Sequence, residues 1–443
     1  MTRECGKPLV EARMADVFTT LEAARHLVKE AEGTLAPRRI GISNPLLVGR
    51  RSRITRHPLG VVGIVAPWNY PLAIPASGVL TALAAGNGVV LKPSEHTPLT
   101  GAFIVDLLAE AGAPQGLVGI VQGAGKVGAA LVDATDAVVF TGSVATGRLV
   151  AEACGRALKP CIVELGGKDP MLVLPGADLD AAARGAVWGA FTNAGQTCAA
   201  VERVGVARPD HDALLERLVA GAGALRLGHG LADGVQMGPL INDDAVRRVK
   251  DHLRTAVAAG AEVACGGEVR GDLGPRFFEP TVLWNVPDDA PAMRDETFGP
   301  LLPVRSYDQL DEAVAWANDS DYGLTASVWG PQKEASAVAA RLEAGTVMTN
   351  DCLYSYAIPE SPWGGWKTSG LGASHGDLGL HALTRWRHDH RVPHGSRSPW
   401  HYPYDADLDR MMAGGGTFLH GQGAAKRVRP APGLMRAWMK RRR

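Results

Sequence analysis

Short apolar segments separated by polar turns characterise the N-terminal part of the chain. No Lys, Arg, Asp or Glu occurs between Arg56 and Lys92, and an uncharged stretch of this length is a candidate membrane span. Prolines, glycines and asparagines, however, divide it into short pieces. Because strands buried on both faces of a parallel sheet are almost continuously apolar, the pieces predict a strand over residues 60–66, a helix over 73–85 and a strand over 88–91.

The alternation of strands and helices continues along the chain. A first series predicts helices over residues 97–112, from 127–132 onward and over 146–154, with strands over 116–122 and 137–140. A second series runs from residue 161 to about 347, with helices near 181–191, 212–222 and 334–344. Strands alternating with helices favour doubly wound α/β sheets.

Composition narrows the class of protein. The 443 residues are 46% hydrophobic and 21% charged with a formal net charge of zero, which is typical of a soluble chain with two or more cores. Zero net charge argues against a nucleic-acid partner. The N-terminus lacks the apolar core of a signal peptide, and the six cysteines are scattered without zinc-ligand spacing, so we expect a cytoplasmic protein without a metal site. His388 and His390 alternate as on a strand, and two such ligands alone are a weak metal signal.

Cys198 and Glu164 are the strongest candidates for chemistry. The cysteine ends the stretch Phe191-Thr-Asn-Ala-Gly-Gln-Thr-Cys198, and the glutamate opens the stretch Glu164-Leu-Gly-Gly-Lys-Asp-Pro170. A thiol in a turn rich in small residues can be held where a substrate reaches it, and a carboxylate followed by two glycines can approach that thiol. A nucleophile with a base is the minimal set for covalent catalysis. Taken alone, Cys198 could equally be a small buried hydrophobe, which is our interpretation of Cys154, Cys161 and Cys265.

Both stretches, 34 residues apart (198 − 164), resemble the active-site signatures of the aldehyde dehydrogenase superfamily. The resemblance implies that Cys198 attacks an aldehyde, that Glu164 activates the water which hydrolyses the thioester, and that Asn69 holds the oxyanion. It also implies a Rossmann-like cofactor domain, a catalytic domain and a β-arm that joins subunits into a homodimer or homotetramer. The residues expected to line the substrate tunnel are Tyr70, Trp188, Thr197 and Trp363.

The cofactor signals lie in the first series. The stretch Phe140-Thr-Gly-Ser-Val-Ala-Thr-Gly147 follows a strand and opens a helix, where backbone N–H groups favour a pyrophosphate. Glu95 follows a buried strand, where α/β sheets bind ligands, and by resemblance faces the adenosine ribose and favours NAD, with NADP as the alternative. The full set implied by resemblance is Pro67, Trp68, Lys92, Ser94, Glu95, Gly142, Ser143, Gly147, Leu165, Glu296 and Phe298. A G-x-G-x-x-G match over residues 123–128 lacks the acidic partner near residue 148 and carries no prediction of cofactor binding.

The expected domain boundaries follow the same resemblance. Residues 1–37 with 58–164 form an N-terminally shortened NAD-binding domain, and residues 165–370 form the catalytic domain. Residues 38–57 with 384–397 form the β-arm, and 398–443 form a basic extension. After Asp409 the chain carries nine Lys or Arg and no Asp or Glu. A solubilising tail is the favoured interpretation, and weak docking on anionic lipid is the alternative.

Two alternatives stay open at this point. A CoA-acylating semialdehyde dehydrogenase would pass the acyl group to CoA, and such relatives tend to lack a glutamate equivalent to Glu164. A catalytically silent homologue is the second alternative, because Asn69 comes early and the family's usual N-terminal portion is shortened. Turnover of an aldehyde with NAD, with and without CoA, separates the three.

Overall fold

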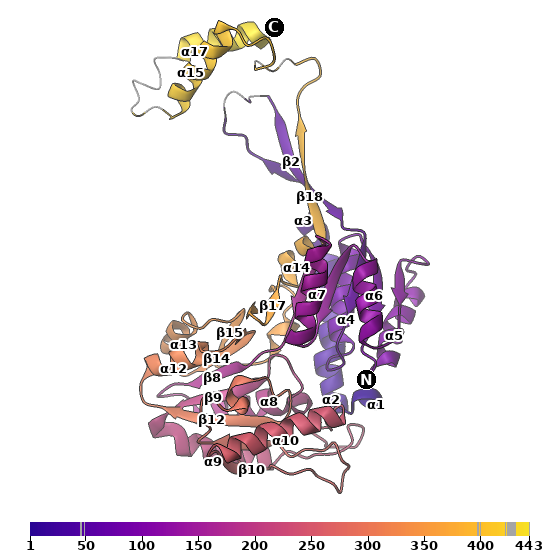
Figure 1. Cartoon of the computed structure of the whole chain (residues 1–443), viewed down its shortest axis with the longest axis vertical. Helices are drawn as coiled ribbons and strands as arrows, with labels where there is room; N and C mark the ends of the chain where they lie inside the picture. Colours follow the sequence, from indigo (N-terminus) through magenta and orange to yellow (C-terminus); the bar gives the residue numbers. More distant parts are fainter. Residues whose placement is uncertain are drawn as a thin grey trace. The chain divides into compact units, whose positions relative to one another are not determined.

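The computed structural model describes residues 1–44, 47, 49–396, 398, 400–420, 422 and 431–442 (Figure 1). The chain forms two compact units, Met1–Ala36 with Arg56–Arg385, and Pro37–Thr55 with Trp386–Arg443. The larger unit holds a six-stranded sheet, a seven-stranded sheet and a two-stranded ladder of β13 (Tyr322–Gly323) and β16 (Trp366–Lys367). The α/β fold expected from the sequence is confirmed.

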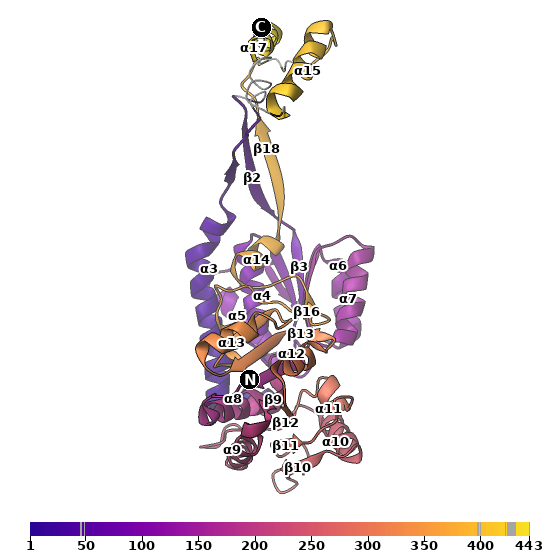
Figure 2. The same ribbon diagram turned by 90° about the vertical axis from the view of Figure 1, so that its left-hand side faces the viewer.

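The six-stranded sheet is parallel except at one edge, where β17 runs antiparallel to β7. Figure 2 shows α4 on one face of this sheet and α6 and α7 on the other. The strands, in spatial order, are β17 (Gly370–Leu371), β7 (Cys161–Glu164), β6 (Ala137–Thr141), β3 (Val61–Val65), β4 (Gly88–Lys92) and β5 (Val118–Ile120). The helices are α4 (Ala73–Ala84), α5 (Pro98–Glu110), α6 (Gly125–Ala134), α7 (Val144–Arg156) and α14 (Gly376–Ala382).

Strand β3 is the point where the winding of this sheet reverses. It pairs in parallel with β4 on one side and with β6 on the other. The connections therefore leave the carboxyl ends of β3 and β6 toward opposite faces, and ligands of open α/β sheets bind in the crevice formed there. The segments after β3 and β6, which begin at Ala66 and Gly142, border that crevice.

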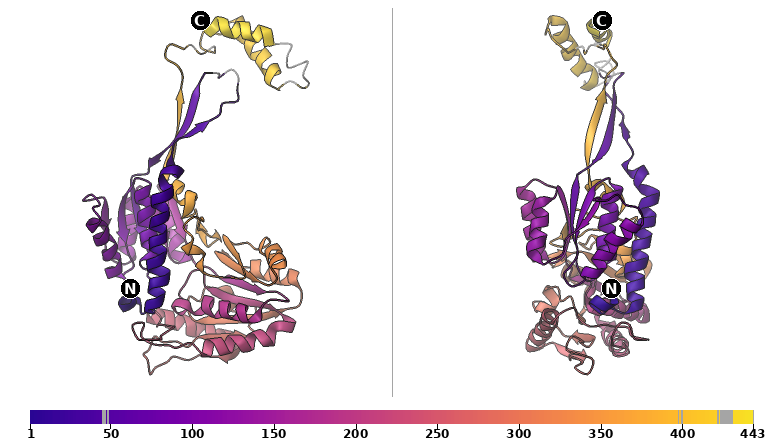
Figure 3. Two further views of the ribbon diagram at one scale, coloured as in Figure 1. Left: turned by 180° about the vertical axis from the view of Figure 1, so that it is seen from behind. Right: turned by 90° about the vertical axis from the view of Figure 1, so that its right-hand side faces the viewer.

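Helix α4 is apolar on nearly all sides, with Ala73, Ile74, Ala76, Val79 and Ala82 all buried. A helix of this kind must be covered on every side. The cover comes from an N-terminal segment that the sequence pattern did not predict as helical, and Figure 3 shows α3 running alongside the sheet. This segment consists of α1 (Thr2–Cys5), α2 (Leu9–Glu11), a π-helix (Ala12–Phe18) and α3 (Thr19–Leu35). Single π-turns are rare and occur often at functional sites.

The seven-stranded sheet is parallel except for β10, which runs antiparallel to β11 at one edge. Its spatial order is β10 (Glu262–Cys265), β11 (Thr281–Trp284), β12 (Leu301–Tyr307), β9 (Val201–Ala207), β8 (Asp169–Val173), β14 (Thr325–Trp329) and β15 (Thr346–Thr349). The helices are α8 (Leu179–Phe191), α9 (His211–Gly223), α10 (Asp243–Ala258), α11 (Pro291–Arg294), α12 (Leu310–Asn318) and α13 (Gln332–Ala339). Three 3₁₀ turns, Thr192–Gly195, Arg208–Asp210 and Tyr354–Ala357, complete the larger unit.

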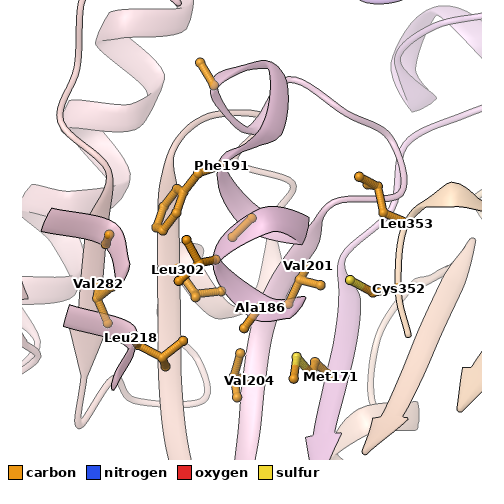
Figure 4. Close-up of a cluster of buried hydrophobic side chains, with 14 of the residues drawn as sticks. Met171, Ala186, Phe191, Val201, Val204, Leu218, Val282, Leu302, Cys352 and Leu353 are labelled. Atoms are coloured by element: carbon orange, nitrogen blue, oxygen red, sulfur yellow. The ribbon is translucent and has the colours of Figure 1, made fainter. Parts of the chain in front are cut away.

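The largest hydrophobic core lies between α8, α9 and this sheet. Figure 4 shows Phe191 at the end of α8 beside Leu302 of β12, in a cluster that also includes Val204 of β9. Phe191 is 2% exposed. Because α8 is anchored by its apolar face, the chain that follows Phe191, including Cys198, starts from a rigid element.

The smaller unit holds a three-stranded sheet in the order β1 (Arg38–Ile40), β2 (Arg51–Pro58) and β18 (Thr384–Arg391), together with α15 (Ala406–His420) and α17 (Ala431–Arg442). His388 and His390 lie on β18, with ring centroids 5.9 Å apart, and His390 Nδ1 is 2.8 Å from the Ser52 hydroxyl. Across the described ranges, no helix has both the length and the apolar composition needed to cross a bilayer.

The predicted elements of the first series are confirmed, and one helix of the second series is shorter than predicted. The sequence predicts a helix over residues 334–344, whereas α13 ends at Ala339. Arg341 and Leu342 donate to the carbonyls three residues earlier, at 2.9 and 3.2 Å. This tight turn closes the helix before the start of β15.

Candidate active site

Two cavities meet at Cys198. The first, here called the apolar cavity, has a volume of about 130 Å³, and the second, the strand-end cavity, about 240 Å³. The apolar cavity is lined by Glu11, Met14, Ala15, Thr19, Tyr70, Ile74, Trp188, Thr192, Thr197, Cys198, Ala199, Leu353, Tyr354, Tyr356, Ala357 and Trp363. The strand-end cavity is lined by Pro67, Trp68, Asn69, Thr141, Gly142, Ser143, Leu165, Gly166, Cys198, Arg248, Glu296 and Phe298. Cys198 lines both, so its thiol can meet a molecule from either side.

The chain that leads to Cys198 is held in an unusual conformation. Asn193, Ala194 and Gly195 have φ values of 52°, 56° and 72°. Non-glycine residues adopt such angles at a cost that the surroundings must offset. Asn193 Nδ2 donates to the Gln196 carbonyl at 3.1 Å, Gln196 Nε2 returns a bond to the Asn193 carbonyl at 2.9 Å, and Gln196 Oε1 accepts from Ile241 N at 2.8 Å. This network fixes where the thiol lies.

The Cys198 thiol is neutral in this environment. Burial raises the pKa of Cys198 well above its usual range, and the carboxyl groups of Asp169, Glu164 and Glu296 raise it further. A hydrogen bond from Ala199 N–H opposes the shift. The thiolate is the reactive form of cysteine. A base must therefore take the proton of Cys198 when a reaction starts.

Asn69 lies beside Cys198 on the strand-end cavity and is 3% exposed. Its Nδ2 donates to the Gln196 carbonyl at 3.1 Å, which orients the side-chain amide and leaves its second N–H for another acceptor. Its backbone carbonyl accepts from Lys7 Nζ at 2.6 Å and from Asn193 Nδ2 at 3.1 Å. The backbone and the side chain of Asn69 are thus both fixed.

Glu164 ends β7 and points into a third cavity of about 20 Å³, which it shares with Thr141 and Ser374. Burial raises the pKa of Glu164 to about 7, although the neighbouring hydroxyl groups of Ser374 and Thr141 lower it. The structure therefore does not bring Glu164 and Cys198 into one cavity. Tyr356 lines both the apolar cavity and the cavity of Glu164. A pKa near neutrality suits a general base, but the carboxylate must rotate to reach the thiol.

The residues expected to hold the cofactor divide into two places. The strand-end cavity contains Pro67, Trp68, Gly142, Ser143, Leu165, Glu296 and Phe298. Lys92, Ser94 and Glu95 lie at the carboxyl end of β4, where Lys92 Nζ is 3.7 Å from the Glu95 carboxylate. Gly147 does not line the cavity: it lies within α7, where an added Cβ would meet Leu165 at 2.3 Å.

The strand-end cavity fits a dinucleotide. Ser143 caps α7 by accepting from Thr146 N, so the N-terminus of this helix faces the cavity, where it favours a pyrophosphate. Glu296 is half-buried, and its partial removal from water raises its pKa to about 8. One of its oxygens accepts from Gly167 N at 3.2 Å, and carboxylate oxygens also accept bonds from ribose hydroxyls. The indole of Trp68 and the ring of Phe298 meet edge to face with centroids 5.5 Å apart and form an apolar wall.

A buried ion pair holds the segment that carries Glu296. Lys168 Nζ is 2.7 Å from Glu202, and Glu202 also accepts from Thr297 N and Phe298 N at 3.0 and 2.9 Å. Phe298 has a φ of 49°. Sequence reasoning singled out neither Glu202 nor Arg248, because both occur in stretches without a recognised motif.

The four residues expected at the substrate tunnel all line the apolar cavity. They are Tyr70, Trp188, Thr197 and Trp363, and the hydroxyls of Tyr70 and Thr197 are 2.7 Å apart. Sequence reasoning missed the contribution of the N-terminal segment, namely Glu11, Met14, Ala15 and Thr19. The one available signal was an acid, Glu11, beside Ala12 on the buried face of a helical stretch.

A second buried ion pair connects the N-terminal segment to the loop that carries Asn69. Lys7 Nζ lies 2.8 Å from Asp16 and 4.2 Å above the Tyr70 ring, and both charged side chains are fully buried. The other oxygen of Asp16 accepts from Leu72 N and Ala73 N, each at 3.1 Å. Asp16 thereby caps the start of α4.

We expect Lys7→Met to destabilise the protein by about 3–5 kcal/mol, because it leaves the Asp16 carboxylate buried without its cation. Denaturant unfolding measures the change in the free energy of unfolding. Arg25→Met is the matched control, since it breaks an exposed pair with Glu22 (2.9 Å) and exposed pairs contribute less than about 1 kcal/mol. Equal effects of the two substitutions would contradict this account of the Lys7 pair.

Comparison with known proteins identifies the chain's relatives. The sequence profile described as "Aldehyde dehydrogenase family" matches residues 1–388. A protein from Mycolicibacterium smegmatis, named as a succinate-semialdehyde dehydrogenase that uses NADP⁺, is 42% identical over 380 residues, which cover 85% of this chain and 73% of the relative. The NAD⁺ complex of an aldehyde dehydrogenase from Bacillus cereus superposes with a TM-score of 0.84 at 36% identity, covering 88% of this chain and 79% of that one. An NAD-dependent aldehyde dehydrogenase from Sinorhizobium meliloti gives a TM-score of 0.83 at 35% identity over 90% and 78% of the two chains.

Within the described residues, no group of three or more His, Cys, Asp or Glu side chains is arranged to hold a metal ion.

Proposed function

Because the chain belongs to the aldehyde dehydrogenase family, we propose that Cys198, Asn69 and Glu164 divide between them the steps of its reaction, the oxidation of an aldehyde to a carboxylate with NAD or NADP. The observation that carries this assignment is the position of Cys198 on both cavities. An aldehyde in the apolar cavity and a nicotinamide in the strand-end cavity would meet at its sulfur. The direct test is reduction of NAD or NADP by the purified protein with a panel of aldehydes.

Cys198 acts as the nucleophile in this proposal. Its sulfur forms a bond to the carbonyl carbon of the aldehyde, and the thiol proton passes to a base. The bound dinucleotide supplies a hydride acceptor. Loss of the aldehyde hydrogen as hydride leaves a thioester on Cys198, and attack by water on the thioester carbon breaks the carbon–sulfur bond. The products are a carboxylate and the free thiol of Cys198.

Asn69 and the backbone N–H of Cys198 stabilise the negative oxygen of the tetrahedral species. The support for Asn69 is its position on the cavity wall, with one N–H held by Gln196 and one free. A donor of this kind lowers the barrier of an acyl-transfer step by about 2.7–4 kcal/mol.

Glu164 activates the hydrolytic water. Its pKa of about 7 means that near neutral pH about half of the carboxyl groups are ionised and able to accept a proton. Gly166 and Gly167 come two and three residues after it, so no side chain at these two positions can block the rotation of Glu164 toward Cys198.

The protein should prefer NAD to NADP by kcat/KM, because Glu95 at the end of β4 repels a 2′-phosphate. Glu95 is half exposed and its charge is shared with Lys92, so we expect a preference on the order of tenfold. Glu95→Gln should reduce the preference for NAD. Glu152→Gln, which removes the charge of an exposed pair on α7, should leave the preference unchanged. Steady-state kinetics with both cofactors measure this, and equal efficiency in the wild type would refute it.

The aldehyde itself is a separate question. Succinate semialdehyde, from the name of the M. smegmatis relative, is one candidate, and it differs from an alkyl aldehyde of similar length by one negative charge.

We also propose a homo-oligomer that covers β18, where the Trp386 side chain is 67% exposed. Light scattering distinguishes a monomer from a dimer or tetramer.

A further inference from the structure

The apolar cavity contains one carboxylate and no cation. Its walls are aromatic, aliphatic and hydroxyl-bearing side chains, and Glu11 is the acidic residue among them. None of the residues that line it in the described structure is Lys, Arg or His. A substrate that enters therefore finds apolar surface and a negative charge.

Glu11 is fixed against the loop that carries the nucleophile. Its two carboxylate oxygens accept from Asn193 N at 3.2 and 3.1 Å, and the Thr192 hydroxyl donates to one of them at 3.4 Å. The side chain is 7% exposed. Because Asn193 has a left-handed backbone, Glu11 both supports that conformation and places its charge at the cavity wall.

Lys7, the cation that lies over the Tyr70 ring, cannot serve a substrate. Lys7 Nζ is 2.8 Å from Asp16 and 2.6 Å from the Asn69 carbonyl, and the Tyr70 ring covers it at 4.2 Å. Its donors are used inside the protein, and the Lys7 side chain does not line the cavity.

A second carboxylate in this cavity would be unfavourable for two reasons. It would lose its hydration without gaining a cation or a full set of donors. It would also lie near Glu11, and like charges at short range in a protein interior disfavour each other. An uncharged aldehyde of the same length meets neither obstacle and gains contacts with Trp188 and Trp363.

We propose that the apolar cavity selects neutral aldehydes with aliphatic or aromatic chains and rejects aldehydes that carry a terminal carboxylate, with Glu11 as a specificity-determining residue. This inference rests on the proposed function. The inference predicts that the substrate of this chain is not the semialdehyde of a dicarboxylic acid.

The test compares two aldehydes that differ mainly in charge, succinate semialdehyde and its methyl ester. It is done above pH 7, where Glu11, whose pKa burial raises to about 7, is ionised. We expect kcat/KM of the wild type to favour the ester by on the order of 100-fold. A wild type that oxidises the semialdehyde as efficiently as the ester would overturn the inference and leave the proposed function intact. Failure to oxidise either compound would contradict the proposed function.

Two variants assign the selectivity to Glu11. Glu11→Gln keeps an oxygen for Asn193 N–H and removes the charge, so the ratio of semialdehyde to ester efficiency should rise about tenfold. Met14→Arg supplies the missing cation at a position that lines the cavity and is 42% exposed, and it should raise the same ratio even if Glu11→Gln does not fold. Glu22→Gln, an exposed carboxylate on α3, is the control and should leave both efficiencies unchanged. An unchanged ratio in both cavity variants would contradict a role for Glu11.

Discussion

Cys198→Ala is expected to abolish aldehyde oxidation while the protein still binds NAD. The thiol is the one nucleophile placed on both cavities, and without it neither the bond to the aldehyde carbon nor the thioester can form. Loss of a nucleophile typically lowers the rate on the order of 10⁴–10⁶-fold. The methyl side chain of alanine leaves the strand-end cavity intact, so calorimetric titration should return an unchanged Kd for NAD.

Cys265→Ala is the matched control for this experiment. Cys265 is a partly buried thiol on the edge strand β10, away from both cavities. Its removal should leave turnover close to that of the wild type. Substantial turnover of Cys198→Ala would rule out the covalent mechanism, and loss of NAD binding in that variant would mean that the substitution disturbs the loop rather than the chemistry.

Glu164→Gln should slow turnover by on the order of 10²–10⁴-fold and reveal the intermediate. If Glu164 serves the hydrolytic water, acylation is less impaired than deacylation. Mixing the variant with aldehyde and NAD should then give a burst of NADH followed by slow turnover. Mass spectrometry should detect the acyl group on Cys198, and added CoA should not restore turnover.

The pH dependence provides an independent check on Glu164. Burial raises the pKa of Glu164 to about 7, so the protonated form predominates below that pH and cannot accept a proton from water. Turnover of the wild type should rise as pH increases through 7 and then level off, and the Glu164→Gln variant should lose this step. The same shift affects the free energy of unfolding, because the folded protein holds the Glu164 proton more tightly than the unfolded chain does. The contribution of Glu164 to stability should therefore be lost as the pH rises from about 4.5 to 7.

Other outcomes would reassign the chemistry. A Glu164→Gln variant with no burst and no adduct would place Glu164 earlier, as the base that ionises Cys198. That role is compatible with the raised pKa of the partly buried Cys198 thiol. Faster wild-type turnover with CoA, with release of an acyl-CoA, would replace hydrolysis by acyl transfer.

The strands and helices near the site could be predicted from local pattern alone. β3 and β4 are largely buried, and their nearly continuous apolar sequences predicted them as strands. The first series also predicted the glycine-rich turn before α7, because Gly142 and Ser143 link a strand to a helix. The placement of the two cavities on either side of Cys198 could not be predicted from periodicity, since it depends on two sheets meeting.

Two features of the site have no local signature. Glu11 acts through Asn193, 182 residues later in the chain, and no spacing rule connects them. Glu164 lies in a cavity apart from Cys198 although both motifs are present, because a side-chain rotation is not encoded in residue spacing. The N-terminal segment, which the sequence pattern did not predict as helical, supplies a π-helix and the Lys7–Asp16 pair at the site.

The pairing of β17 with β7 has a consequence for biosynthesis. Gly370 lies opposite Glu164 in the ladder, Leu165 N donates to the Ser369 carbonyl at 2.9 Å, and the Ser369 hydroxyl donates to the Gly166 carbonyl at 2.7 Å. While the ribosome is still translating the residues between them, β7 has a bare edge, and bare edges invite pairing with other chains. A nascent chain that stalls before residue 370 would therefore expose the strand that carries Glu164, and we expect such truncated products to aggregate or to be captured by chaperones.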